Sequence, residues 1–140
     1  MSRPGLGFGM RHVALFVRDM AACEQFYVNL LGMEVEWRPD EHNVYLTSGG
    51  DNVALHQAEP EVKRDEASQR LDHIGFFLDS AEAVDHWFDW LNGHQVRMRS
   101  EPRDHRDGAR SFYCYDPDGT LVQMIHHPEV SQWEQLKGLN

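Results

Sequence analysis

Two histidines stand at matching places in a repeated sequence, where they could act together as metal ligands. His12 and His73 each open a short segment rich in β-branched and aromatic residues, and segment 12–17 falls on segment 73–78 when the chain is aligned with itself. Neutral imidazole nitrogens are good donors for iron, manganese, nickel, cobalt and zinc. Because a duplicated unit repeats the place of each residue in the fold, we expect both imidazoles to face one shared cavity and to bind one divalent metal ion.

The repeat continues through a helix. The alignment that places His12 on His73 also places the apolar positions of 23–30 on those of 84–91 without a gap, and a glycine follows each stretch. Apolar residues recur at i, i+3, i+4 and i+7 in both copies, which predicts one helix per copy with a single buried stripe. Asp19 and Ser80 are suitable N-cap residues for these helices. The chain is therefore predicted to be an internal duplication.

Segments with the composition of strands flank each helix. The strands expected in the first copy are 12–17, 33–37, 43–47 and 52–57, and those in the second are 73–78, 95–99, 111–115 and 120–126. Turns join the last two strands of each copy, and aligning these turns, Gly50 on Gly119, places Ala54 on Gln123. We predict a single α+β domain of two βαβββ units, with unit boundaries at 10–57 and 71–126, a charged linker at 58–70 and a tail at 127–140.

These features together resemble the vicinal oxygen chelate superfamily. The resemblance rests on the paired βαβββ units, the opening strands that carry histidine, and a closing Asp-Pro-Asp-Gly hairpin at 116–119, and it covers residues 10–126. That group includes glyoxalase I, methylmalonyl-CoA epimerase, extradiol dioxygenases, fosfomycin-resistance enzymes and bleomycin-binding proteins. The resemblance implies that each unit curls its sheet into a half-barrel, that the halves enclose a small-molecule site, and that the protein is a homodimer.

The same resemblance implies four ligand positions, on the first and last strands of each unit. Residue by residue, these positions hold His12, Ala54, His73 and Gln123. Ala54 cannot coordinate a metal, and Gln123 replaces the usual glutamate with an amide oxygen. His56 lies two residues beyond Ala54 on the same strand face, and it could supply a fourth ligand if the strand were shifted or bent. Two imidazoles and one amide carry no negative charge, so a metal-free cleft lined by paired polar residues is the alternative interpretation.

A charged loop at 103–110 carries a further resemblance, to extradiol dioxygenases. Those enzymes place a histidine ahead of a Ser-Phe-Tyr strand that leads into a Pro-x-Gly hairpin. By position, His105 is the acid–base residue and Tyr113 is the residue that contacts substrate. Histidine can pass protons near neutral pH, tyrosine can donate a hydrogen bond to an enolate or phenolate oxygen, and Arg110 could clamp an anionic substrate. The alternative is a solvated loop of mutually neutralising charges, with Tyr113 filling a strand position.

Three functions are consistent with these residues. The first is a metal-dependent enzyme that acts on a small oxygen-chelating substrate, either as a glyoxalase-like lyase or isomerase or as a ring-cleaving dioxygenase. The second is a metal-free protein that binds small molecules, like the bleomycin-sequestering members of the group. The third is a non-catalytic partner domain, which no motif favours.

The overall charge limits the class of partner. The formal net charge of −10 argues against nucleic acid or an anionic membrane surface as a general partner. The longest uninterrupted apolar run, 13–17, is far too short to span a bilayer, and the N-terminal segment 1–10 lacks the apolar stretch of a signal peptide. With only two cysteines, Cys23 and Cys114, we expect a cytoplasmic protein without a disulfide framework.

Overall fold

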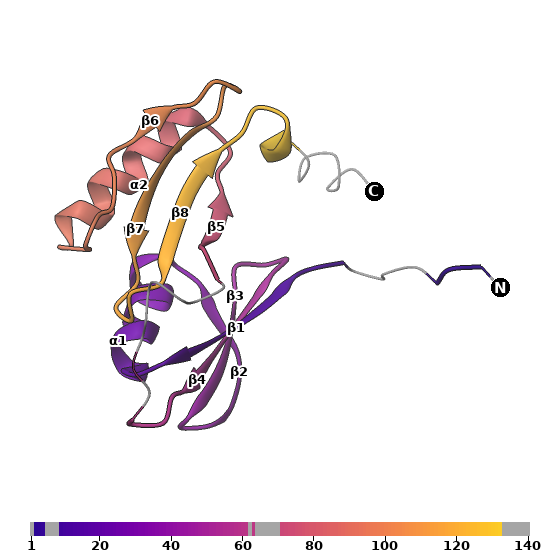
Figure 1. The fold of residues 1–140 in the computed structure, drawn as a ribbon, viewed down its shortest axis with the longest axis vertical. Coiled ribbons are helices and arrows are strands. Elements are labelled where there is room, and N and C mark those ends of the chain that lie inside the picture. The colour runs from indigo at the N-terminus through magenta and orange to yellow at the C-terminus, as the bar shows by residue number, and fades with distance from the viewer. Residues whose placement is uncertain (1, 5–8, 62, 64–70, 133–140) are drawn as a thin grey trace. The chain divides into compact units, whose positions relative to one another are not determined.

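The computed structural model describes residues 2–4, 9–61, 63 and 71–132, and the chain forms two compact units (Figure 1). Unit 1 spans Met1–Lys63 and unit 2 spans Arg64–Asn140. Each unit contains one four-stranded mixed sheet whose helix packs against one face. Much of the expected linker and tail lies outside the described residues. Across the described part, no helix combines the length and the apolar character that crossing a membrane requires.

Unit 1 follows the order of elements that its sequence predicts. The elements are β1 (His12–Val17), the helix α1 (Met20–Glu24), the π-helix η1 (Gln25–Leu30), β2 (Glu34–Asp40), β3 (Asn43–Thr47) and β4 (Asn52–Gln57). The strand order in the sheet is β1-β4-β3-β2, in which β1 runs parallel to β4 and the other pairs are antiparallel.

The helix of unit 1 begins and ends close to the expected residues. The carboxylate of Asp19 accepts a hydrogen bond from the backbone amide of Ala22 at 3.0 Å, as an N-cap does. The chain leaves the helix through Gly32 with a φ of +89°, a conformation that costs glycine little. Its second half widens into a π-helix, which the apolar spacing did not indicate. Phe26 and Tyr27 in this part are buried and meet edge to face, with ring centroids 4.9 Å apart.

Unit 2 repeats the arrangement with a longer helix. Its elements are β5 (Ile74–Phe77), α2 (Ala81–Gly93), β6 (Arg103–Asp104), β7 (Arg110–Tyr115), β8 (Leu121–His126) and the 3-10 helix η2 (Val130–Gln132). The strand order is β5-β8-β7-β6, with β5 parallel to β8. The hydroxyl of Ser80 caps α2 by accepting a hydrogen bond from the amide of Ala83 at 3.1 Å.

The strand register shows that the two units are copies of one another. Ala14 pairs with Ala54 in unit 1, and Gly75 pairs with Gln123 in unit 2. The alignment of the opening strands places Ala14 on Gly75, and the alignment of the closing strands places Ala54 on Gln123, so the first pair becomes the second. The predicted architecture of two βαβββ units is therefore confirmed, and one strand in unit 2 needs correction.

The strand predicted at 95–99 is wrong. This segment makes a single bridge, between Met98 and Cys114, and the regular edge strand is instead β6, which lay inside the predicted loop. The amides of Arg99 and Ser100 both donate to the carbonyl of Tyr113, at 2.8 and 3.2 Å, so two residues share one position of the ladder. A bulge of this kind interrupts regular pairing, and a left-handed Gln95 with a φ of +62° precedes it.

Each sheet has one face toward its helix and one open face. Along β1, Leu15 is buried toward the helix, whereas the neighbouring Phe16 is exposed on the other side. In unit 2, Phe112 is buried against Phe88 of α2, with ring centroids 5.4 Å apart. The next residue, Tyr113, therefore belongs to the open face. Strand alternation thus decides which side chains remain for binding and catalysis.

Candidate functional site

His12 is held by an amide on the neighbouring strand. Its Nδ1 lies 2.7 Å from Oδ1 of Asn52. The amide nitrogen of Asn52 donates to the carboxylate of Glu36 at 2.9 Å, which turns the amide oxygen toward the imidazole. Because that oxygen only accepts, the proton of the neutral ring is on Nδ1 and the lone pair is on Nε2. In its neutral form His12 therefore offers the lone pair of Nε2 to a metal.

His56 is held in the same way at the other end of the strand pair. Its Nδ1 lies 2.5 Å from Oδ1 of Asn43, and the amide nitrogen of Asn43 donates to both carboxylate oxygens of Asp40, at 2.9 and 3.1 Å. Hydrogen bonds from the His42 amide and then from Asn43 lower the pKa of Asp40. Ala54, between the two histidines along the face, is buried and offers no donor.

Aromatic rings occupy the rest of the open face of unit 1. Tyr45 stacks on Trp37 with centroids 5.1 Å apart, and its ring lies 6.3 Å from that of His12 and 6.0 Å from that of His56. Phe16 lies 6.2 Å from His56. The ring of Tyr45 therefore lies beside both candidate ligands of unit 1, His12 and His56.

His73 has a carboxylate as its partner. Its Nδ1 lies 2.6 Å from Oδ2 of the preceding Asp72, and 33% of its side chain is exposed. A carboxylate that accepts from Nδ1 leaves the lone pair of the neutral ring on Nε2, an arrangement common among histidines that bind metals. The ring of His73 meets that of Tyr113 edge to face, with centroids 5.4 Å apart. The structure thus brings a predicted ligand and a predicted catalytic residue together.

Gln123 and His105 meet at one serine on the open face of unit 2. The side-chain nitrogen of Gln123 donates to Oγ of Ser111 at 3.2 Å, and Nε2 of His105 lies 2.8 Å from the same oxygen. Gln123 is also the register partner of Tyr113. The sequence did not indicate a role for Ser111. Its position two residues before Tyr113 predicts only that both side chains lie on the same face of the strand.

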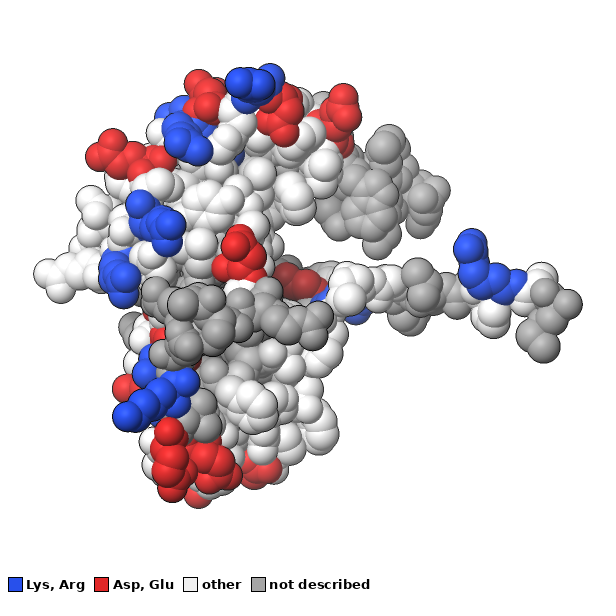
Figure 2. Space-filling view, in the orientation of Figure 1, with Lys and Arg blue, Asp and Glu red and all other residues white. Residues whose placement is uncertain are grey.

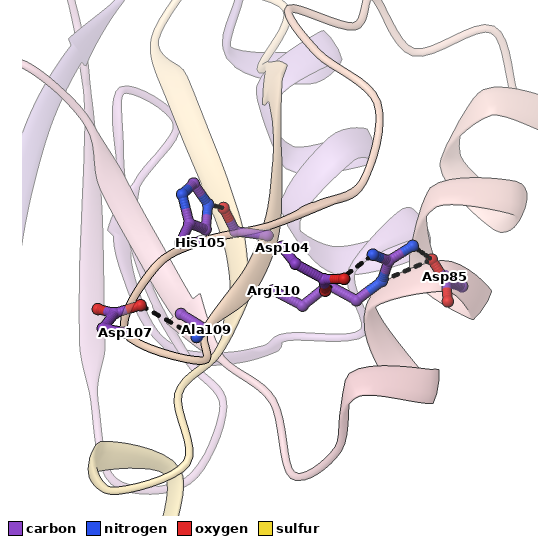
Figure 3. A network of polar contacts seen from close by, with 7 residues as sticks. Asp85, Asp104, His105, Asp107, Ala109 and Arg110 are labelled. Carbon is purple, nitrogen blue, oxygen red and sulfur yellow. Dashed lines mark hydrogen bonds and ion pairs between the residues drawn. The ribbon is translucent and has the colours of Figure 1, made fainter.

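Arg110 lies apart from these residues. Its Nε and Nη2 donate to Oδ1 of Asp85 on α2, at 3.2 and 2.8 Å, and its Nη1 donates to Oδ1 of Asp104 at 3.0 Å (Figure 3). These two carboxylates raise the pKa of Arg110. Strand alternation places it on the helix side of the sheet, opposite Tyr113. Arg110 therefore lies on the face opposite Tyr113, with its guanidinium engaged by two carboxylates.

The turn that carries His105 is fastened at several points. The backbone of His105 exchanges hydrogen bonds with Ala109 and Gly108, and Oδ1 of Asp107 accepts from the amide of Ala109 at 3.0 Å (Figure 3). Oδ2 of Asp107 also pairs with Nε2 of His127 at 3.2 Å, a contact that the sequence did not suggest. The Ala109 amide and then His127 lower the pKa of Asp107. The turn is therefore tied to the segment after β8.

The candidate ligands are imidazole nitrogens and an amide oxygen, which are atom types that bind divalent metals. Unit 2 offers the imidazole of His73 and the amide oxygen of Gln123 on its open face, and unit 1 offers the imidazoles of His12 and His56. All these donors are neutral. Among the described residues, no three His, Cys, Asp or Glu side chains form a group that could hold a metal ion.

Comparisons with known proteins agree with this architecture. A curated relative, the metallothiol transferase FosB of Staphylococcus epidermidis, is 34% identical over 118 residues, which cover 82% of this chain and 79% of the relative. The FosB protein of Staphylococcus saprophyticus is 31% identical over 116 residues, covering 82% of this chain and 74% of the relative.

Solved structures match the fold. A glyoxalase/dioxygenase from Nostoc punctiforme aligns with a TM-score of 0.75 at 24% identity, covering 92% of this chain and 97% of the other. The fosfomycin resistance protein FosX from Listeria monocytogenes aligns with a TM-score of 0.70 at 22% identity, covering 89% and 97%. The model of one family matches residues 9–124. The chain therefore belongs to the glyoxalase/bleomycin resistance protein/dioxygenase superfamily.

Proposed function

We propose that this protein is a divalent-metal-dependent enzyme that acts on a small, oxygen-chelating substrate. In this proposal Nε2 of His12, Nε2 of His73 and Oε1 of Gln123 hold the metal. The observation that carries it is the shared state of the two opening histidines, each of which has Nδ1 bound to an oxygen and its lone pair on Nε2. When bound, the metal supplies a Lewis acid that polarises adjacent substrate oxygens. Iron, manganese, nickel, cobalt and zinc are all compatible with imidazole donors.

Among the possible reactions, we propose transfer of a thiol to an electrophilic carbon. Several curated relatives at 29–34% identity are metallothiol transferases. In such a step the thiol gives up its proton, the sulfur–carbon bond forms and a carbon–oxygen bond breaks with its electron pair. The leaving oxygen takes a proton, so that no proton is gained or lost overall. A lyase or isomerase that uses its glutamate ligand as the base is less well supported, because the amide of Gln123 cannot take a proton.

The residues near His73 have separate roles in the proposal. Because Nε2 of His105 faces Ser111, its Nδ1–H donates the proton that the leaving oxygen takes. Tyr113 donates a hydrogen bond to a substrate oxygen. Their position on one open face of the sheet supports both assignments. For Arg110 we propose a structural role, because two carboxylates already engage its guanidinium. Ring cleavage remains the second reaction, since the pair of His105 and Tyr113 also suits a catecholate.

We also propose a homodimer in the cytoplasm with a small molecule as its substrate. Cys23 and Cys114 are buried and are not joined in a disulfide, which suits a reducing compartment. On the face drawn in Figure 2, the described basic side chains are interspersed with acidic ones. A net charge of −10 supports a small-molecule substrate over nucleic acid or a membrane surface.

Metal analysis of protein purified without an affinity tag tests the first part of the proposal. We expect one equivalent of divalent metal per chain, and loss of that metal in a His12→Ala, His73→Ala double variant that keeps its circular dichroism spectrum. The matched control is His86→Ala, which removes an exposed imidazole from α2. Absence of metal, together with no response to added nickel, manganese or zinc, would overturn the enzyme and favour metal-free ligand binding.

Product analysis tests the reaction. Metal-loaded protein is incubated with cysteine or glutathione and an epoxide-bearing phosphonate, and mass spectrometry detects the thiol conjugate. Parallel assays follow isomerisation of a hemithioacetal and oxygen uptake with a catechol. We expect conjugate only, and none from the metal-stripped protein. Oxygen uptake that depends on His105 would instead establish the dioxygenase.

A further inference from the structure

A glutamine ligand creates a problem that a glutamate ligand does not have. Both ends of a carboxylate are oxygen atoms, whereas an amide can bind a cation only through its oxygen. The side chain of Gln123 must therefore be turned so that Oε1 faces the open side of the sheet. Its partners on the neighbouring strands, Gly75 and Tyr113, define the surroundings of this side chain.

The hydroxyl group of Ser111 sets this orientation of the Gln123 amide. The side chain of Ser111 is almost fully buried, at 1% exposure, and its Oγ lies between Nε2 of Gln123 at 3.2 Å and Nε2 of His105 at 2.8 Å. A hydroxyl has one proton to donate. If that proton goes to the lone pair on Nε2 of His105, Oγ can only accept from Gln123. The amide must then present its nitrogen to Ser111 and its oxygen to the opposite side.

Gly75 leaves the other side of the amide open. A methyl group placed on Gly75 would lie 3.8 Å from Oε1 of Gln123, so this oxygen lies over a position that has no side chain. A larger residue there would cover the oxygen. The ladder thus holds the amide nitrogen on the β7 side and exposes the amide oxygen on the β5 side.

The turn around His105 keeps the imidazole in place. Asp107 binds both the amide of Ala109 and the ring of His127, and a methyl group on Gly108 would lie 3.2 Å from the ring of Pro128. The turn that carries the imidazole is therefore fastened by contacts outside the open face. A chain of hydrogen bonds runs from this turn through Ser111 to Gln123.

We infer that Ser111 is a positioning residue which, with His105 as its acceptor, directs the amide oxygen of Gln123 toward the metal. This inference rests on the proposed function, because it assumes that Gln123 is a ligand. It assigns Ser111 no contact with substrate. It also explains how a neutral ligand can serve where the superfamily's usual residue is a carboxylate.

A double-mutant cycle tests the inference, with nickel binding measured by calorimetry. Ser111→Ala should weaken binding about fivefold, the usual worth of one hydrogen bond, when residue 123 is glutamine. In a Gln123→Glu background the same substitution should change binding less than about twofold, because either carboxylate oxygen can bind the metal. An equal loss in both backgrounds would show a general structural effect and overturn the inference.

Two further variants separate this inference from the proposed function. Gln123→Ala should weaken nickel binding at least as much as Ser111→Ala does, and unchanged binding would remove Gln123 from the ligand set altogether. In metal-free protein, the side-chain amide protons of Gln123 should exchange slowly by nuclear magnetic resonance, and faster in Ser111→Ala. Ser111→Thr, which keeps the hydroxyl, should restore slow exchange. Fast exchange in the unmodified protein would contradict the hydrogen bond itself.

Discussion

In unit 1 the candidate ligand His12 donates to the amide of Asn52, whereas in unit 2 the equivalent His73 donates to the carboxylate of Asp72. The closing strands differ as well, because Ala54 offers no donor and Gln123 offers an amide oxygen. Buried apolar residues face the helix in both units, Leu15 in the first and Phe112 in the second, and the register of the opening and closing strands is the same. Duplication has therefore kept the backbone and the core, while the open faces have diverged in chemistry.

The first prediction concerns the contrast between the two faces of one sheet. Phe112 is fully buried against α2, whereas Phe77 on the open side is 57% exposed. Phe112→Ala should lower the free energy of unfolding by about 3–5 kcal/mol, because it leaves a cavity in the core. Phe77→Ala should cost less than about 1 kcal/mol. Urea unfolding of both variants measures the difference, and equal losses would mean that the open face is packed in solution.

The second prediction sharpens the contrast between the closing strands. Gln123→Glu adds an anionic ligand to a neutral set, so nickel affinity should rise by about tenfold or more. Gln25→Glu, on an exposed position of η1, adds the same charge away from the open faces and should leave affinity unchanged. Calorimetric titration compares the two variants. A matching rise in both would attribute the effect to net charge.

Strand alternation explains how much of the site could be predicted from the sequence. His73, Tyr113 and Gln123 share one face because two of them are register partners and the third precedes the neighbouring strand. The same rule places Arg110 on the opposite face of the sheet, because it lies an odd number of residues from Tyr113. Such placements follow from local pattern once the strands are known.

The remaining parts of the site depend on contacts between distant segments. The bulge at Arg99 and Ser100 and the short β6 arise from pairing with β7 and leave no periodic signal. Ser111 is a small polar residue whose proposed role depends on its hydrogen bonds to His105 and Gln123, which are distant in the sequence. The contact between Asp107 and His127 likewise joins a loop to a segment beyond the last strand.

The third prediction compares the ion pairs that tie each helix to its sheet. Arg110 makes three hydrogen bonds to two carboxylates with 25% of its side chain exposed, whereas Arg38 pairs with the single carboxylate of Glu24 and has 42% of its side chain exposed. Arg110→Met should therefore cost about 1 kcal/mol of unfolding free energy, and Arg38→Met about half as much or less. Thermal unfolding at low and at high salt measures both. A larger loss of unfolding free energy for Arg38→Met than for Arg110→Met would contradict this prediction.

The last prediction uses one turn carboxylate from each unit, Asp40 and Asp107. Hydrogen bonds from the His42 amide and the Ala109 amide, respectively, are the largest causes that lower their folded-state pKa below the ordinary value of 3.8. A carboxyl with a lowered folded pKa stabilises the fold above its unfolded pKa, and this contribution is lost as the pH falls through the folded value. Asp40→Asn and Asp107→Asn should therefore lower the melting temperature at pH 7, with differences from the unmodified protein that shrink below about pH 4.

The control is Glu59→Gln, at an exposed position. If the differences persist at pH 2, the substitutions act through the shape of the turns and not through the charge of these carboxylates.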